Sequence, residues 1–315
     1  MRPDAAGFGA VLLLAGCAGL PTVNLNELDD RAAAVELDGV PFHSQQDFYC
    51  GPASLLTVLE ASGTSPAFEN VVARVYVPEL KGSLQAEMAA AARGFGRIPF
   101  RLPGTLEAVL DQLEAGYPVL ILQNLGLEAV PIWHYAVVVG FDRKRNRMVM
   151  RSGDKPRLET PAGRWLRQWH RAGRWGLVVL EPGQLPAGAD RDLTLRALAD
   201  FERQAEPDAQ LVAWQAAVAR WPDDPVAWLG AGNAGFRVGN HRDAEWAYQR
   251  ALELEPGHLP ARLNLAHTLE AEGRTCEAVE LLAAAPPAAD HPLKQRADEL
   301  LGDLKRACRT SGESS

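Results

Sequence analysis

Two residues of this 315-residue chain have the types and neighbours that nucleophilic catalysis requires, Cys50 and His134. Cys50 precedes Gly51-Pro52, and because proline is favoured in the first turn of a helix, we expect the thiol at a helix N-terminus. The positive end of that helix and its free N–H groups would lower the thiol pKa and stabilise a substrate oxyanion. Cys50 is therefore the candidate nucleophile, although a cysteine before a helix is more often a buried apolar residue.

His134 is the candidate base. It lies between Trp133 and the apolar run that starts at Tyr135, where a protonatable side chain costs free energy unless it has a partner. An imidazole within reach of the thiol could accept its proton and pass it to a leaving amine. A lone histidine there is usually a satisfied core or edge residue, but its combination with Gln45, Cys50 and the following Gly-Pro favours catalysis.

The pattern around these residues predicts the elements that position them. Helical periodicity follows Cys50 and recurs at 84–94 and 106–115. Short apolar runs predict strands at 118–122, 135–139, 147–151 and 175–180. Helices first and an antiparallel sheet afterwards predict an α+β domain.

The second half of the chain is almost entirely composed of helix-forming residues and follows a linker rich in proline and glycine at 183–190. Its 34-residue period resembles the tetratricopeptide pattern, best in the copy formed by Trp228, Gly232, Ala244, Tyr248, Ala251 and Pro256. The same frame includes Trp214 one period earlier and Ala278 one period later. We expect an all-α repeat solenoid over 191–309 with a capping helix at 292–308, and a concave face that binds a protein or peptide. The alternative is a generic helical bundle.

The catalytic motifs resemble a known family. Gln45-x4-Cys50-Gly51-Pro52-Ala53, followed by His134-Tyr135-Ala136-Val137-Val138-Val139-Gly140, is similar to the papain-like peptidases that trim double-glycine leaders from bacteriocins. The closer similarity is to stand-alone lipoprotein members with tetratricopeptide repeats. The resemblance covers about 37–181 and implies a papain-like fold, Cys50 as nucleophile, His134 as base and an oxyanion glutamine at Gln45, with Gln46 as the alternative. No transporter segment follows, so cleavage coupled to export is not implied.

The residue that orients His134 departs from this family. Members have an Asp or Asn just after the strand beyond the histidine, and here Arg151-Ser152-Gly153-Asp154 fills that region. Asp154 is our candidate because it is the nearest carboxylate, whereas strand register puts Ser152 at the family position. Asp142 is a weaker candidate and is expected in a turn. If neither acid reaches the imidazole, the enzyme should be slow.

The N-terminus resembles a lipoprotein signal. An apolar run ends in Leu14-Ala15-Gly16-Cys17, which implies a signal peptide at 1–16, lipid on Cys17 and a polar tether at 17–36. Ala18 after the cysteine suggests the outer membrane of a bacterial envelope, facing the periplasm. An ordinary export signal is the alternative. In an oxidising periplasm, the remaining Cys276 and Cys308 could form a disulfide.

Length and composition set the limits on function. The chain is long enough for two domains, each with its own core: a peptidase domain at 37–182 and the repeats at 191–309. A net charge of -8 argues against nucleic acid, and the scattered cysteines argue against a zinc site. No cofactor is implied. The prediction is a cysteine peptidase acting on a peptide or protein; the alternatives are an inactive scaffold for an envelope assembly and a thiol acyltransferase or amidase.

Overall fold

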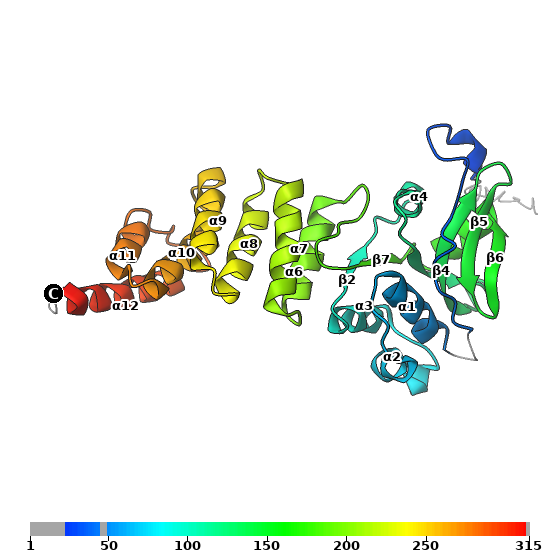
Figure 1. The fold of residues 1–315 in the computed structure, drawn as a ribbon, viewed down its shortest axis with the longest axis horizontal. Coiled ribbons are helices and arrows are strands. Elements are labelled where there is room, and N and C mark those ends of the chain that lie inside the picture. Colours follow the sequence, from blue (N-terminus) through cyan, green and yellow to red (C-terminus); the bar gives the residue numbers. More distant parts are fainter. Residues whose placement is uncertain (1–22, 45–48, 313–315) are drawn as a thin grey trace, which may run out of the picture.

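The computed structural model of the chain describes residues 23–44 and 49–312, with side chains to residue 310. The predicted signal peptide, Cys17, Gln45 and Gln46 lie outside these residues. An α+β domain is followed by a row of helices, so the predicted fold class is confirmed (Figure 1).

The α+β domain is built on one antiparallel sheet. Its strands are β1 (Ala34–Glu36), β2 (Ile98–Arg101), β3 (Val119–Asn124), β4 (Trp133–Asp142), β5 (Arg147–Ser152), β6 (Lys155–Pro161) and β7 (Gly176–Leu180). The order is β2-β7-β3-β4-β5-β6, and β1 also pairs with β4. The four predicted strands are β3, β4, β5 and β7. The edge strand β6 escaped prediction because Lys155, Pro156, Arg157 and Glu159 hide any apolar alternation.

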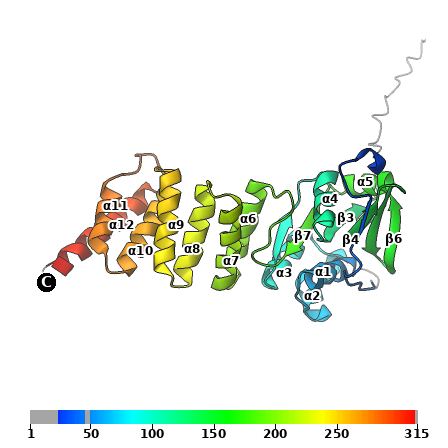
Figure 2. The ribbon, with the colours of Figure 1, turned by 45° about the horizontal axis from the view of Figure 1, so that its top comes forward.

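Helices cover both faces of this sheet. The helices α1 (Cys50–Ala61), α2 (Phe68–Val75) and α3 (Gln85–Gly94) lie on one face, and α4 (Leu106–Glu114) and α5 (Ala162–His170) lie on the other (Figure 2). Two short 3-10 helices, Leu25–Glu27 and Pro78–Leu80, occur in the loops. The odd-numbered β4 residues Tyr135, Val137 and Val139 contribute to the core under α1, whereas Ala136 and Val138 belong to the opposite core. Alternation along one strand therefore separates the two layers.

The expectation of one core per half of the chain is wrong. The core on the α4 and α5 side of the sheet continues without a break into the repeats, through Leu195, Leu198 and Phe201 of α6 (Arg191–Glu202). The linker before α6 is also fixed, because the Gln112 side chain exchanges hydrogen bonds of 2.8 and 3.0 Å with the backbone of Ala187. The repeats are thereby packed rigidly against the sheet domain.

The expected tether is wrong for the part that the structure describes. Leu25 is fully buried in the sheet domain, and β1 pairs with β4. The Arg143 side chain donates hydrogen bonds to the carbonyl oxygens of Leu25 and Arg31 at 3.0 and 2.7 Å. The folded domain therefore includes residues 23–36 rather than beginning at Leu37, since this segment supplies a buried side chain and a strand that its polar composition conceals.

The repeats consist of paired helices. After α6 come α7 (Pro207–Arg220), α8 (Pro225–Arg237), α9 (His241–Leu254), α10 (Leu259–Ala271), α11 (Thr275–Ala283) and α12 (Lys294–Gly312). Small residues lie where helices approach closely: a Cβ on Gly232, which the repeat pattern predicted, would come within 2.5 Å of the Tyr248 ring, and one on Gly230, which it did not, within 2.3 Å of the Trp214 ring. The aromatic residues of the 34-residue frame fill the space that these glycines leave.

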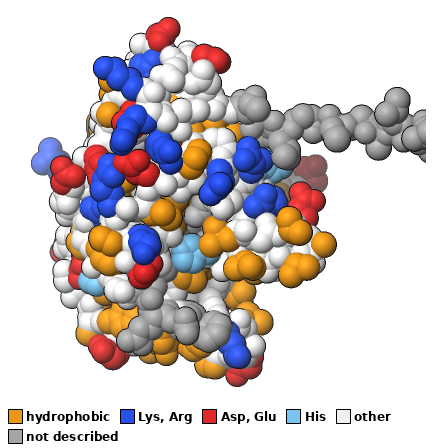
Figure 3. All heavy atoms as spheres, turned by 90° about the vertical axis from the view of Figure 1, so that its right-hand side faces the viewer, with side chains coloured by type: hydrophobic (Ala, Val, Ile, Leu, Met, Phe, Trp, Pro, Cys, Tyr) orange, Lys and Arg blue, Asp and Glu red, His pale blue; other side chains and the backbone are white. Residues whose placement is uncertain are grey.

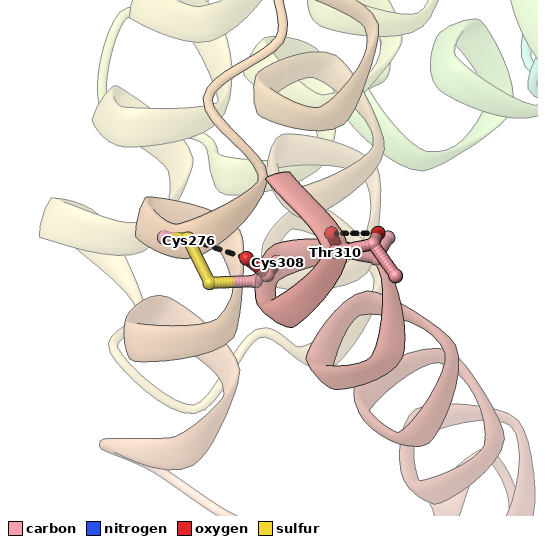
Figure 4. The surroundings of a disulfide bond; sticks show 4 residues. Cys276, Cys308 and Thr310 are labelled. Carbon is pink, nitrogen blue, oxygen red and sulfur yellow. Dashed lines mark hydrogen bonds between the residues drawn. A yellow bond between two sulfur atoms is a disulfide. The ribbon is translucent and has the colours of Figure 1, made fainter. Parts of the chain in front are cut away.

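The last helix is attached covalently. Cys276 in α11 and Cys308 in α12 form a disulfide with a Cα–Cα distance of 5.1 Å, so the pairing that the sequence left open is confirmed (Figure 4). A disulfide that closes a loop of this length stabilises the folded state by restricting the unfolded chain, typically by about 2–4 kcal/mol. The bond therefore holds the capping helix on the end of the solenoid.

We predict that Gly230→Ala lowers the melting temperature of the repeats, because the added methyl group would overlap the buried Trp214 ring. Overpacking of this kind costs about 1–3 kcal/mol. Gly257→Ala is the matched control, since a Cβ there meets nothing within 4 Å. Thermal unfolding followed by circular dichroism should separate the two variants, and equal melting temperatures would contradict the close helix packing.

Candidate active site

Cys50 is the first residue of α1, as predicted, and it lies where that helix meets β4. Gly51 is needed beside it because a Cβ would come within 2.4 Å of the Ser83 Oγ. The Tyr135 hydroxyl donates a hydrogen bond of 3.2 Å to the Ser83 carbonyl. The first turn of α1, the loop before α3 and β4 are thus packed around the thiol.

The electrostatics of the thiol differ from the sequence prediction. Burial raises the pKa of Cys50, and this outweighs the backbone N–H groups of Tyr135, Gly51 and Cys50, which lower it. The expectation that the helix N-terminus lowers the pKa of Cys50 overall is therefore wrong. Removing a thiolate from water costs more free energy than the hydrogen bonds of these backbone groups contribute. Cys50 is a neutral thiol near neutral pH in this structure, and its proton must be removed during any attack.

His134 lies at the start of β4 and has one clear polar partner. Its Nε2 atom is 2.9 Å from the Ser152 Oγ, which comes from the end of β5. The β4–β5 and β5–β6 pairings both shift register near this end of the sheet. Burial lowers the pKa of the imidazole, so His134 is neutral at neutral pH and is able to accept a proton.

Ser152, rather than Asp154, is the residue that binds His134. The Asp154 carboxylate is 74% exposed and pairs with Lys155 at 3.2 Å, so the choice of Asp154 is wrong. Physically, Ser152 is the last strand residue and stays in the sheet beside β4, whereas the chain turns away at Gly153, which has a positive φ of 62°. Asp142 accepts a hydrogen bond from the Arg145 backbone N–H at 3.0 Å, the turn role that the sequence indicated.

The thiol at the start of α1 and the imidazole at the start of β4 are related through the backbone of Tyr135, without a direct bond. One of the backbone N–H groups that act on the Cys50 thiol belongs to Tyr135, the residue after His134. Among the described residues, no hydrogen bond joins the thiol to the imidazole, whose bonded partner is Ser152. Proton transfer between them requires the two side chains to approach, as often happens when a substrate closes an active site. Gln45, the predicted oxyanion residue, is outside the described residues.

A cavity of about 810 Å³ opens beside the thiol. Its lining is mainly apolar and includes Cys50, Leu80, Leu84, Leu122, Trp133 and Tyr135. Leu80, Leu84 and Trp133 are respectively 59%, 47% and 55% exposed, although residues of this kind are usually buried. The loop that carries Leu80 and Leu84 was not predicted to be part of the site. Its signal was the Pro78 to Gly82 turn, which Val77 and Gly82 close as an isolated bridge.

A second hollow of about 500 Å³ is lined by Phe42, His43, Ser44, Tyr49 and Phe68. The neighbouring residues Tyr49 and Cys50 thus line different hollows. No group of three or more His, Cys, Asp or Glu side chains that could hold a metal ion occurs within 23–44 and 49–312.

We predict that Ser152→Asp raises the pKa of His134, because an adjacent carboxylate stabilises the imidazolium. An opposite charge at this range shifts a pKa by about 1–3 units. As the pH falls, His134 would then become protonated at a higher pH than in the parent chain. Any reaction that needs the neutral ring would therefore be lost earlier on the acidic side of its pH profile. The measurement is an NMR titration of the imidazole. Asp154→Asn is the control and should leave the titration unchanged; a shift in the control alone would restore Asp154 as the partner.

Comparisons with known proteins agree with the two-part architecture of the chain. Residues 37–156 match the family model described as Peptidase_C39 like family, and residues 235–303 match that described as Tetratricopeptide repeat. No curated protein matches the chain.

Two solved structures resemble one half of the chain each. A proposed C39-like peptidase from Bacillus anthracis is 17% identical, with 48% of this chain and 98% of that chain covered and a TM-score of 0.40. The type III secretion translocator chaperone SycD of Yersinia enterocolitica is 18% identical, with 38% of this chain and 85% of that chain covered and a TM-score of 0.35. The chain therefore contains a Peptidase_C39-like domain at residues 37–156 and tetratricopeptide repeats at residues 235–303.

Proposed function

We propose that the α+β domain is a thiol peptidase in which Cys50 is the nucleophile and His134 the general base. The observation that carries the proposal is the half-buried Cys50 thiol at the N-terminus of α1, beside the β4 residue that follows a neutral histidine held by Ser152. A structural cysteine with no catalytic role does not need a helix N-terminus and an open cavity beside it.

The two steps follow from the protonation states. His134 accepts the thiol proton while the Cys50 Sγ attacks the peptide carbonyl carbon, and the backbone N–H groups at the start of α1 stabilise the oxyanion. The imidazolium then gives its proton to the leaving amine, and a thioester remains. Water, deprotonated by His134, attacks the thioester; the carboxylic acid leaves and the thiol is restored. The net change is hydrolysis of one peptide bond.

The substrate class is a protein or peptide with an apolar segment. The cavity beside Cys50 is bordered by the exposed side chains of Leu80, Leu84 and Trp133, which gain about 25 cal/mol for each Å² of apolar surface that a substrate covers. The repeats would hold the substrate protein near this cavity. Their groove of about 700 Å³ is lined by Asn233, Arg237, Tyr248, Asn264 and His267, among others.

We predict that the purified chain hydrolyses unfolded proteins slowly and that Cys50→Ala abolishes this hydrolysis. His134→Ala should reduce it by about 10²–10⁴-fold, the usual contribution of a general base. Asp154→Asn is the control and should retain full activity, since that carboxylate faces solvent. Mass spectrometry of the products is the measurement. Cleavage that persists in Cys50→Ala would refute the proposal.

A second candidate is a protein-binding scaffold in which the peptidase domain has little or no activity. It is favoured by the raised thiol pKa and by Ser152 at the place where the family has an acid, since a neutral hydroxyl stabilises an imidazolium less than a carboxylate does. Proteins captured on the intact chain distinguish the two. A scaffold retains the same uncleaved partners with or without Cys50→Ala, whereas a peptidase accumulates a trapped substrate only in the variant.

We further propose that the chain is exported and anchored by lipid on Cys17, which makes it a bacterial envelope lipoprotein. The proposal is supported by Leu14-Ala15-Gly16-Cys17 and by the disulfide between Cys276 and Cys308, because such bonds persist mainly in oxidising compartments. No helix in the described part of the chain is long and apolar enough to cross a bilayer.

We predict that Cys17→Ser moves the chain from the membrane fraction to the soluble fraction of an expressing bacterium. The acyl chains that would hold it contribute about 0.8 kcal/mol for each buried methylene group, and the variant cannot carry them. Membrane fractionation and labelling with a radioactive fatty acid are the measurements. Cys50→Ala is the control and should stay labelled; equal labelling of Cys17→Ser would exclude this anchor.

A further inference from the structure

The sheet domain has a local charge opposite to that of the chain. The net charge is -8, but residues 142–174 contain eleven Lys and Arg residues against three Asp and Glu residues. The net charge of the whole chain therefore conceals a cationic region that phosphate groups could contact. In Figure 3, which faces the sheet end of the molecule, basic side chains gather over its upper half.

Helix α5 carries the part of this charge that is free to bind. Its inner side buries Ala162, Trp165, Leu166 and Trp169 against the sheet. The spacing of Arg164, Arg167 and Arg171 places them along one outer side of the helix. Among the described residues, neither Arg164 nor Arg167 forms an ion pair, nor does Lys144 in the adjoining turn; Arg171 donates to the Asn124 carbonyl at 2.9 Å. We call Lys144, Arg164, Arg167 and Arg171 the basic face.

Nearby acids do not cancel this charge, because several are already paired. Asp111 and Glu114 of α4 both bind Arg31, and Asp29 binds Arg143 at 3.0 Å. Glu159 binds Arg145 and Arg157. The cations of the basic face therefore remain available to an external anion.

One residue places the N-terminal segment beside the basic face. The Asn146 side chain accepts a hydrogen bond from the Leu25 N–H at 3.0 Å and donates one to the Val23 carbonyl at 3.2 Å. The Asn146 carbonyl accepts a hydrogen bond of 2.9 Å from Ala162, the first residue of α5. The chain thus enters the described structure, six residues after Cys17, at the start of the helix that carries the free cations (Figure 2).

We propose that the basic face binds the anionic headgroups of a phospholipid membrane. The binding of headgroups does not depend on the proposed anchor at Cys17. The orientation of the sheet domain on the membrane does depend on it. An anchor alone lets a domain rotate, and a cationic surface next to the anchor fixes which side meets the bilayer. Because α5 lies on the opposite side of the sheet from α1, this contact turns the cavity beside Cys50 away from the membrane. The site is thereby presented to soluble proteins.

The test is sedimentation of the full chain, carrying Cys17→Ser so that no lipid contributes, with vesicles of equimolar phosphatidylcholine and phosphatidylglycerol. We expect binding that is absent with phosphatidylcholine alone and is lost as salt rises from about 0.05 M to about 0.5 M. Each cation near an anionic surface contributes about five-fold in affinity. The triple variant Lys144→Gln, Arg164→Gln and Arg167→Gln should therefore bind roughly 100-fold more weakly.

The matched control is Arg242→Gln, Lys305→Gln and Arg309→Gln, which removes the same charge from exposed positions of the repeats. It should bind like the parent chain, and all variants should have equal melting temperatures. The proposal would be overturned if both triple variants bound the vesicles equally or if the parent chain did not bind them. It would also be overturned if the parent chain bound double-stranded DNA more tightly than the vesicles. None of these readouts uses peptidase activity or acylation, so the result is independent of both earlier proposals.

Discussion

The contact between the first turn of α1 and strand β4 is the constraint on which the functional half of the molecule depends. It brings the Cys50 thiol to the backbone of Tyr135 and allows no side chain at Gly51, where Ser83 packs closely. The same contact supplies backbone donors and removes water. Burial has the larger effect on the pKa of the thiol and also lowers the pKa of His134, so both side chains are neutral at neutral pH and form no ion pair.

In this arrangement, deprotonation of the Cys50 thiol would depend on the binding of a substrate. Where a carboxylate orients the histidine, the imidazolium is stabilised in advance; here Ser152 orients the ring through a neutral hydrogen bond and contributes little to its charge. A substrate that fills the apolar cavity would exclude more water and bring the two side chains together. Under the proposed function, such a site would act only on a bound chain, in keeping with a substrate that is first held by the repeats.

The rest of the fold restricts where that site can point. The core on the α5 side of the sheet continues through α6 into the solenoid, and the disulfide fixes α12 at the far end (Figure 1). Asn146 ties the N-terminal segment to the start of α5. Basic face, cavity and repeat groove therefore belong to one continuously packed structure, because the two halves share a core.

Local patterns in the chain were sufficient for the helix at Cys50, the strand at His134, the repeats and the order of fold classes, because periodicity and the Gly-Pro step are properties of neighbouring residues. The thiol pKa, the partner of His134 and the burial of residues 23–36 were not accessible in this way. Each depends on segments distant in sequence: β4 against α1, β5 against β4, and Asn146 against Leu25. Burial and hydrogen-bond partners are decided only when distant segments pack together. Asp154 is therefore near the expected position in the sequence for a partner of His134, and yet its carboxylate faces solvent.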